Sequence, residues 1–180
     1  MTRVELKRRP SARPAPQGVA PASNAYAIDR VFVVHVGDEV MGLPIDRVQT
    51  VFMAREIAPA PLTPPWVRGL VNLRGTVVTA ISLRARLGLP ERGPQTEDCG
   101  GELGIAVDVD GEAFALLVDK VGDVAQMTQG TALVAPGAMS EKARRLTACV
   151  YARDSGLLPI IDLRAAVFDQ ASKTDLITQD

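Results

Sequence analysis

The apolar residues of this chain occur in short runs, and turn-forming residues interrupt these runs at close intervals. One such run, 31–36, is rich in β-branched residues and ends at Gly37-Asp38. Runs of this kind predict β-strands, and the Gly, Asp and Pro residues between them predict turns. No stretch of about 15 residues shows the helical period that crossover helices would require. The pattern therefore favours an all-β fold of small barrels over an α/β fold.

The predicted strands form four hairpins, and the one around Asp110-Gly111 carries the strongest turn signal. Two short helices are also expected, each directly after a hairpin. The strands are predicted at 31–36, 40–45, 67–73, 76–81, 105–109, 114–118, 146–151 and 157–161, and the helices at 83–87 and 163–168.

The sequence also repeats its own pattern. Residues 37–39 (Gly-Asp-Glu) align with 110–112 (Asp-Gly-Glu), and 45–48 align with 118–121 at the same offset of 73 residues. Residues 81–85 align with 161–165 at an offset of 80. A period this long predicts a duplicated small barrel rather than a solenoid.

The two halves are expected at about 28–88 and 103–168, joined by an exposed loop between Gly88 and Gly101. Because such small units bury a low share of their surface, the halves are expected to pack against each other. Three matched pairs should then be buried, namely Val33 with Ala106, Ile45 with Val118, and Ile81 with Ile161.

The folded domain is predicted at 26–169, between two tails. Residues 1–25 contain four prolines and a net charge of +4, from Arg3, Lys7, Arg8, Arg9 and Arg13 against Glu5. This composition predicts a disordered tail that folding does not require. Its basic residues leave open a contact with a membrane surface or nucleic acid, and they weakly resemble a transit peptide. Residues 170–180 form a second, polar tail.

Composition argues against several classes of protein. The net charge of −1 gives the whole molecule no electrostatic footprint for nucleic acid. Cys99 and Cys149 lie far apart without a CxxC or Cys/His pattern, so neither a zinc site nor a disulfide is expected. No apolar run approaches the roughly 18 residues of a membrane span, and no signal peptide follows the basic start. A soluble, cytoplasmic protein is expected.

The sequence contains little that points to catalysis. His35, the single histidine, matches Asp108 in the repeat, and both are expected on the solvent side of their strands. The glycine-rich phosphate loops are absent. Asp108-x-Asp110-Gly111 lacks the further ligands and helices of an EF-hand, so it is interpreted as a turn. We therefore expect a binding module that is not an enzyme and holds no metal or cofactor.

The segment 66–78, which contains Asn-Leu-Arg-Gly, resembles the signature of CheW-like domains, the adaptor family of bacterial chemotaxis. Residues 45–49, 118–124 and 157–163 resemble further motifs of that family in the correct order. The resemblance covers about residues 28–168. Four ordered segments are specific, whereas Asn-Leu-Arg-Gly alone would be weak.

The resemblance implies two intertwined five-stranded SH3-like barrels packed together, with short helices and no catalytic site. It implies a scaffold that couples the cytoplasmic tip of a methyl-accepting chemotaxis receptor to the regulatory domain of a CheA-type histidine kinase. Nucleic acid is not an expected partner, and a membrane is met only through receptors. The partner-binding residues that we expect on this basis are Val48, Thr50, Asn72, Arg74 and Gly75.

A physical reason for the Asn-Leu-Arg-Gly motif is available. Gly75 can adopt a positive φ at the turn, and Asn72 can bond the turn's own backbone. Arg74 can then present its planar fork of donors at the surface. The alternative is that these three residues only hold the turn.

The sequence departs from the family pattern at three positions. Thr50 stands where the family often has a glutamate, Thr79 where it favours proline, and Ser82 where it favours aspartate. The second half keeps that last pair as Pro159 and Asp162. Three alternatives therefore stay open: an adaptor of a divergent, non-motility chemosensory pathway, a small-barrel nucleic-acid binder, and an enzyme with an unrecognised pocket.

Overall fold

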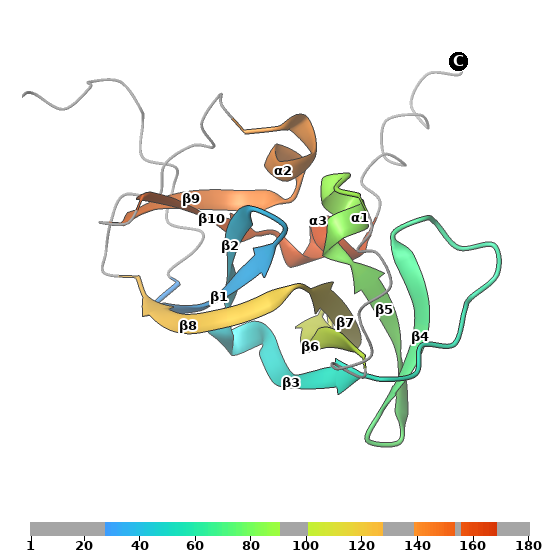
Figure 1. Cartoon of the computed structure of the whole chain (residues 1–180). Helices are drawn as coiled ribbons and strands as arrows, with labels where there is room; N and C mark the ends of the chain where they lie inside the picture. The colour runs from blue at the N-terminus through green and yellow to red at the C-terminus, as the bar shows by residue number, and fades with distance from the viewer. Residues whose placement is uncertain (1–27, 91–100, 128–138, 154–155, 169–180) are drawn as a thin grey trace, which may run out of the picture.

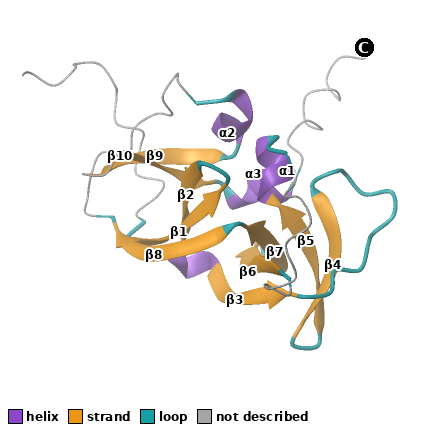
Figure 2. Ribbon diagram, viewed as in Figure 1, coloured by secondary structure: helices purple, strands orange, loops and turns teal. Residues whose placement is uncertain are grey.

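The computed structural model describes residues 28–90, 101–127, 139–153 and 156–168 (Figures 1 and 2). Strands dominate these residues, and the α-helices among them have five residues each. No helix in the described part of the chain has the length and apolar character that a bilayer crossing requires. The expected tails at 1–25 and 170–180 lie outside the described residues, as does most of the expected loop.

The same order of strands and closing helix occurs twice along the chain, with η1 as an addition in the first half and α2 in the second. The first half contains β1 (Arg30–Val36), β2 (Glu39–Pro44), the 3-10 helix η1 (Ile45–Arg47), β3 (Val48–Ala54), β4 (Val67–Leu73), β5 (Thr76–Ser82) and α1 (Leu83–Leu87). The second half contains β6 (Glu102–Val109), β7 (Glu112–Val118), β8 (Lys120–Gln126), α2 (Glu141–Arg145), β9 (Thr147–Arg153), β10 (Gly156–Ile161) and α3 (Leu163–Val167).

The strands assemble into two five-stranded sheets, and each sheet takes strands from both halves of the sequence. Sheet 1 has the order β8-β1-β2-β10-β9, and sheet 2 has the order β3-β6-β7-β5-β4. Exchanging each strand with its match in the other half (β1 with β6, β2 with β7, and so on) converts one order into the other. The predicted duplication is therefore present in the topology. Each half contributes one hairpin, β1–β2 or β6–β7, to the sheet that the other half completes.

All eight predicted strands are found, but β3, β8 and α2 were missed. The strands β3 and β8 are edge strands, so a large part of each remains exposed and the apolar signal is weak. In β8, Gly122 and Asp123 resemble turn residues although they lie inside the strand. Local patterns identified the other strands, including the edge strands β4 and β9, because each of these has at least two buried residues, whereas β3 and β8 have one each.

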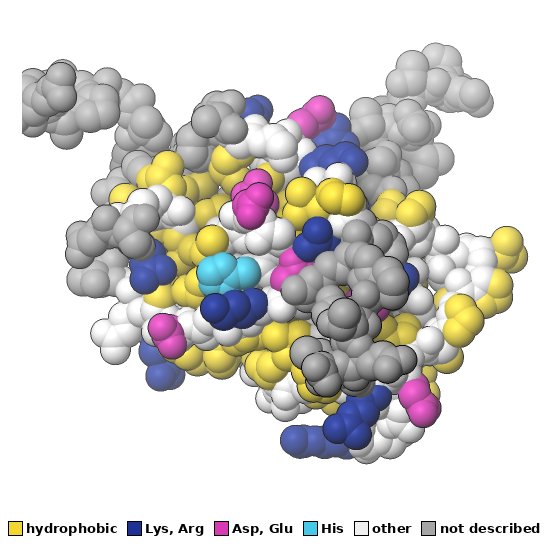
Figure 3. Space-filling view, in the orientation of Figure 1, with side chains coloured by type: hydrophobic (Ala, Val, Ile, Leu, Met, Phe, Trp, Pro, Cys, Tyr) yellow, Lys and Arg dark blue, Asp and Glu magenta, His cyan; other side chains and the backbone are white. Residues whose placement is uncertain are grey.

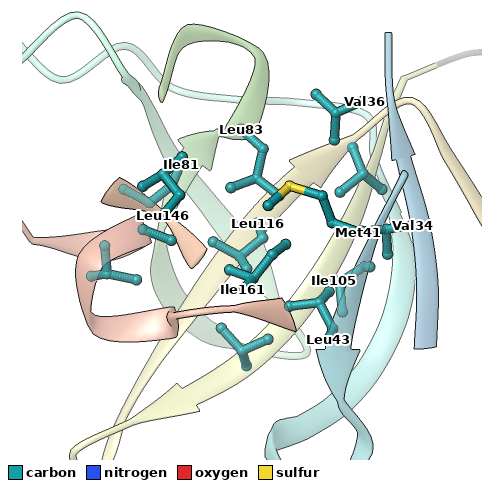
Figure 4. Close-up of a cluster of buried hydrophobic side chains, with 14 of the residues drawn as sticks. Val34, Val36, Met41, Leu43, Ile81, Leu83, Ile105, Leu116, Leu146 and Ile161 are labelled. Carbon is teal, nitrogen blue, oxygen red and sulfur yellow. The ribbon is translucent and has the colours of Figure 1, made fainter. Parts of the chain in front are cut away.

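The largest apolar cluster is built from both sheets (Figure 4). It contains Met41 and Leu43 from β2 and Leu116 from β7, each at most 1% exposed. In Figure 4 the Met41 side chain points toward Leu83 at the start of α1. Two smaller clusters are separate from it, one with Val31 and Ile160 of sheet 1 and one with residues of β5 and β7 in sheet 2. The main core thus joins the two halves, as expected.

The burial prediction for the matched pairs holds at four of the six positions. Ala106, Val118, Ile81 and Ile161 are buried, whereas Val33 and Ile45 are only half-buried. Val33 lies where the pairing of β1 with β8 shifts register, between Phe32 and Val34. Ile45 begins η1, which has no buried residue. The prediction was wrong at these two positions because local irregularities turn both side chains partly out of the core.

The repeat extends to individual hydrogen bonds at the starts of α1 and α3. Ser82 Oγ accepts from the Ala85 amide at 3.2 Å, and Asp162 Oδ1 accepts from the Ala165 amide at 3.0 Å. Each is the N-cap of its helix, and serine and aspartate are both favoured there. The departure from the family pattern at Ser82 therefore leaves the local structure unchanged.

One partly buried ion pair connects the two sheets. The Arg84 guanidinium, on α1 directly after β5 of sheet 2, pairs with the Asp119 carboxylate between β7 and β8. The same carboxylate accepts from the backbone amide of Gly37, in the β1–β2 turn of sheet 1. The side chains of Arg84 and Asp119 are 20% and 12% exposed, so water screens this pair less than a surface pair.

We expect the two halves to fold only together. When the chain is divided into fragments 1–95 and 96–180, each fragment lacks three strands of one sheet, two strands of the other and a large part of the central cluster. Each fragment alone should show neither a cooperative thermal transition nor dispersed amide signals by NMR. The equimolar mixture should recover both. A cooperative transition in either fragment alone would contradict the exchanged topology.

We also expect Asp119→Ala to lower the free energy of unfolding by about 1–3 kcal/mol, because it leaves a partly buried guanidinium unpaired. Asp46→Ala is the matched control, since Asp46 holds the equivalent position in the first half and is 72% exposed. The control should change stability by less than about 0.5 kcal/mol. Urea denaturation of both variants measures this difference, and equal effects would mean that the pair contributes no more than a surface charge.

Candidate partner-binding surface

Asn72, Arg74 and Gly75 meet in the turn between β4 and β5. Arg74 and Gly75 have φ values of +53° and +90°, and the Gly75 amide donates to Asn72 Oδ1 at 2.8 Å. Two successive positive φ values are typical of the tight turns that match the twist of paired strands. The roles expected for Asn72 and Gly75 in the turn are thus seen in the geometry.

The Arg74 side chain is exposed at the tip of this hairpin, which projects at the bottom of Figure 1. Within the described part of the chain it has no hydrogen bond, ion pair or ring contact. A residue with a Cβ at positive φ is strained by roughly 1 kcal/mol relative to glycine. The backbone of Arg74 is therefore fixed as expected, but no described side chain holds its guanidinium.

Val48 and Thr50 lie on β3 and are both half-buried. Val48 packs against the central cluster, so much of its surface serves the core. The Thr50 hydroxyl makes only a long contact, 3.4 Å, with the carbonyl oxygen of Val51. The exposed apolar residues of this strand are instead Val51 and Met53, at 39% and 43%. The sequence prediction missed Val51 and Met53, whose spacing of two residues places both on one face of β3.

The strand register shows where Val48 and Thr50 lie relative to the β4–β5 turn. Val48 pairs with Val107 on β6, which pairs with Phe114 on β7. Phe114 pairs with Thr79 on β5, which pairs with Leu70 on β4. The start of β3 and the tip of the β4–β5 hairpin therefore lie toward the same end of sheet 2. β3 and β4 are the two edge strands of sheet 2. The predicted residues therefore form two separate groups, one with Val48 and Thr50 and the other in the β4–β5 turn.

Apolar side chains accompany Arg74 on the exposed face of its hairpin. Leu70 and Val77 are 38% and 63% exposed, and Val77 pairs directly with Asn72 across the strands. We call Leu70, Asn72, Arg74 and Val77 the hairpin surface. Figure 3 shows further hydrophobic side chains over the connection between β3 and β4, where Leu62 is fully exposed. Exposed apolar residues beside an arginine are a composition typical of protein interfaces.

The described residues show no arrangement for covalent chemistry. They contain no cluster of three or more potential metal ligands. Burial raises the pKa of the Cys149 thiol, which disfavours the nucleophilic thiolate. Cys99 lies outside the described residues. His35 and Asp108 are half-buried between buried valines on their strands, so their side chains lie on the outer sides, as expected.

A cavity of about 360 Å³ lies between η1, the β6–β7 turn and the start of α3. The groups with a raised pKa, Cys149 and Tyr151, are not part of its lining. Desolvation by burial is the main cause of the raised pKa in both. The raised pKa values of these two residues and the cavity therefore do not coincide in space.

The strain at Arg74 leads to a prediction about stability. Arg74→Gly should raise the free energy of unfolding by about 0.5–1 kcal/mol, because glycine adopts the positive φ without steric cost. Arg74→Ala, which removes the side chain and keeps the Cβ, should leave stability unchanged. Thermal melting of both variants measures this. A clear loss of stability in Arg74→Ala would show that the arginine itself holds the turn.

Comparison with known proteins agrees with the resemblance seen in the sequence. The family model described as CheW-like domain matches residues 30–171. A probable chemotaxis protein CheW of Rhizobium etli is 27% identical over 138 residues, which cover 77% of this chain and 86% of that protein. A chemotaxis protein CheW of Rhizobium meliloti is 27% identical over 128 residues, covering 71% and 80%.

A solved structure is similar as well. The scaffolding protein TtCheW from Thermoanaerobacter tengcongensis superposes with a TM-score of 0.66 at 25% sequence identity. The match covers 78% of this chain and 94% of that one. The prediction of two small SH3-like five-stranded barrels with short helices is confirmed by this likeness and by the two sheets. The family model matches most of this chain, which therefore belongs to the CheW-like domain family.

Proposed function

We propose that this protein is a non-enzymatic scaffold of a chemotaxis pathway, which couples the cytoplasmic tip of chemoreceptors to the regulatory domain of a CheA-type histidine kinase. It would act in the cytoplasm and meet a membrane only through receptors. Membership of the CheW-like domain family supports this proposal. The hairpin surface and the start of β3 would supply the contacts, without a cofactor.

The observation that carries the proposal is the conformation of Arg74. Its backbone is in the left-handed region, and its exposed side chain has no hydrogen-bond or ion-pair partner in the described residues. Glycine or asparagine would suit this turn position better, so turn stability does not explain an arginine here. Strained residues of this kind occur at functional sites. Arg74 therefore has the features of a contact residue awaiting a partner.

The surroundings of Arg74 suit a protein partner. Arginine is enriched among the residues that dominate binding energy, and such residues are surrounded by contacts that exclude water. Leu70 and Val77 can provide those contacts, since both lie on the exposed face of the same hairpin. A planar guanidinium also pairs with carboxylates in a bidentate manner, which favours an acidic group on the partner.

The β3 strand would contribute a more apolar contact than the family pattern implies. Thr50 supplies a hydroxyl where the family often has a carboxylate, so a basic site on a partner should bind this strand less strongly. Val51 and Met53 are exposed beside it. This difference supports a divergent version of the same role, for example in a chemosensory pathway that does not control motility.

The nucleic-acid alternative has less support. Base stacking needs exposed aromatic rings. Phe114 is buried, and Phe32, Phe52 and Trp66 are half-buried against the apolar clusters. The Trp66 ring is also covered by the Arg86 guanidinium, 4.6 Å from its centroid. These four rings therefore offer no platform of the kind that single-stranded nucleic acid requires.

We expect Arg74→Ala to weaken binding to the native receptor and kinase by roughly 1–3 kcal/mol, about 5- to 150-fold, while the fold stays intact. Arg74→Lys should recover only part of the affinity, because an ammonium cannot pair in a bidentate manner. Isothermal titration calorimetry with purified partners measures both effects. Arg153→Ala is the matched control, since Arg153 is exposed at the end of β9, the counterpart of β4 in sheet 1.

Three outcomes separate the interpretations. Loss of binding in a folded Arg74→Ala protein supports the hairpin surface. Unchanged binding by that variant would falsify the assignment of Arg74 to the interface. Equal losses in Arg74→Ala and Arg153→Ala would show a general effect of surface charge, and failure of the wild type to bind either partner would contradict the coupling role itself.

A further inference from the structure

The duplicated fold contains two sites that occupy equivalent positions and are arranged differently. In the first, the Asp119 carboxylate accepts from the Arg84 guanidinium and from the Gly37 amide. The side chains of Asp119 and Arg84 are largely buried. We call Gly37, Arg84 and Asp119 the closed site, because a guanidinium of the protein itself satisfies its carboxylate.

The repeat places Asp110, Arg164 and Asp46 at the matching positions in the other half. There the arginine does not reach the equivalent carboxylate. Arg164 pairs with Asp110 at 2.8 Å, whereas the only ion contact of Asp46 within the described residues is one of 3.5 Å with its neighbour Arg47. The Asp46 side chain is 72% exposed, against 12% for Asp119. We call Asp46, Asp110 and Arg164 the open site.

The two sites differ in the residue at the turn, Gly37 in the closed site and Asp110 in the open site. Gly37 has no side chain, so it leaves Arg84 free to pair with Asp119. Asp110 occupies the matching turn position at φ +56° and adds a second carboxylate. Two carboxylates then compete for one guanidinium, and Arg164 pairs with the nearer one. Asp46 consequently loses the cation that its counterpart has.

The cavity of about 360 Å³ lies at the open site. Besides the three residues of that site, its lining includes Asp108, Asp162 and Arg47. Four aspartates face two arginines, so these side chains carry a net charge of −2. The volume is sufficient for one long side chain. A cavity with this charge favours a cation, and the closed site shows that the equivalent carboxylate binds a guanidinium.

We propose that the cavity binds a basic side chain, and that the N-terminal segment of the same chain, residues 1–27, supplies it. Ile28 is the first described residue and is part of the cavity lining. The segment is therefore joined covalently to a residue of the cavity wall. Its basic residues exceed its acidic ones by four, with Arg13 nearest to the cavity along the sequence.

The length of the segment permits this contact. Arg13 precedes Ile28 by 15 residues, and a chain of that length has a typical end-to-end distance of about 20 Å. A tethered group is present at an effective concentration of the order of millimolar. An interaction of about −4 kcal/mol in total, summed over several ion pairs, has a Kd near that concentration and would be half-populated without any further partner.

The contact is expected to be weak and dependent on salt. Exposed ion pairs contribute about 0–1 kcal/mol each and are screened at physiological ionic strength. Occupancy by the segment would therefore be reversible, and a basic segment of another protein could compete for the cavity. This inference does not rest on the proposed coupling function, because it concerns a different surface from the hairpin surface.

The test uses the full-length protein labelled with nitrogen-15. It is compared by NMR with a tail variant in which all five basic residues of the segment become glutamine: Arg3→Gln, Lys7→Gln, Arg8→Gln, Arg9→Gln and Arg13→Gln. At low salt the amide signals of Asp46, Asp110 and Arg164 should differ between the two proteins. The difference should vanish at high salt. The amide of Asp38, an exposed acidic residue in the β1–β2 turn, is the internal control.

A second variant distinguishes the cavity from general attraction between charges. Asp110→Gly copies the closed site, so Arg164 should turn to Asp46 and the cavity should lose its affinity for cations. In this background the tail changes should no longer shift the Asp46 amide. Asp38→Asn, which removes one acidic charge elsewhere, should preserve the wild-type response.

Several results would overturn the proposal. One is the absence of any difference at Asp46 and Asp110 between the wild type and the tail variant. Another is an equal shift at Asp38, which would indicate nonspecific attraction. If added arginine amide shifts the cavity residues while the tail changes do not, the segment is not the occupant, and a basic side chain of a partner takes its place.

Discussion

The apolar cluster between the two sheets is the constraint on which this structure depends. Its side chains come from both halves of the sequence, with Met41 and Leu116 among those almost fully removed from solvent. The clusters confined to one sheet are smaller, so neither sheet has enough apolar surface of its own to be stable. Exchange of the β1–β2 and β6–β7 hairpins follows from the same requirement, because it places strands of each half on both sides of the shared core.

Because the fold is duplicated, its two halves can be compared within one molecule. Where the matched residues are alike, the structure repeats to the level of single hydrogen bonds, as the N-caps Ser82 and Asp162 show. Where they differ, the local arrangement differs with them. Asp110 stands at the turn position that matches Gly37, and Arg164 pairs with Asp110 whereas Arg84 pairs with Asp119. Differences in polar residues at turns have thus made the two ends of a symmetric framework chemically distinct.

The sequence predicted what local patterns encode and missed what distant contacts decide. The inner strands and the Arg74-Gly75 turn were predicted because β-branched runs and turn residues act over a few positions. The strands β3 and β8 were missed because each has a single buried residue and therefore a weak apolar pattern. The half-burial of Val48 could not be predicted, since it depends on the central cluster, which assembles from distant segments. That Arg74 has no side-chain partner among the described residues could not be predicted either, because it depends on which residues the fold places around the hairpin tip.

The division between core and turns explains how this fold can serve as a scaffold. The residues that hold the sheets together are apolar and buried, whereas the candidate contacts lie at a hairpin tip, on an edge strand and in a cavity beside a turn. A change at Arg74 or Asp110 removes little buried surface, because both side chains are exposed. Binding properties can therefore change with small effects on folding. The same separation accounts for the departure at Thr50, where a family acid is replaced on an edge strand whose pairing with β6 remains intact.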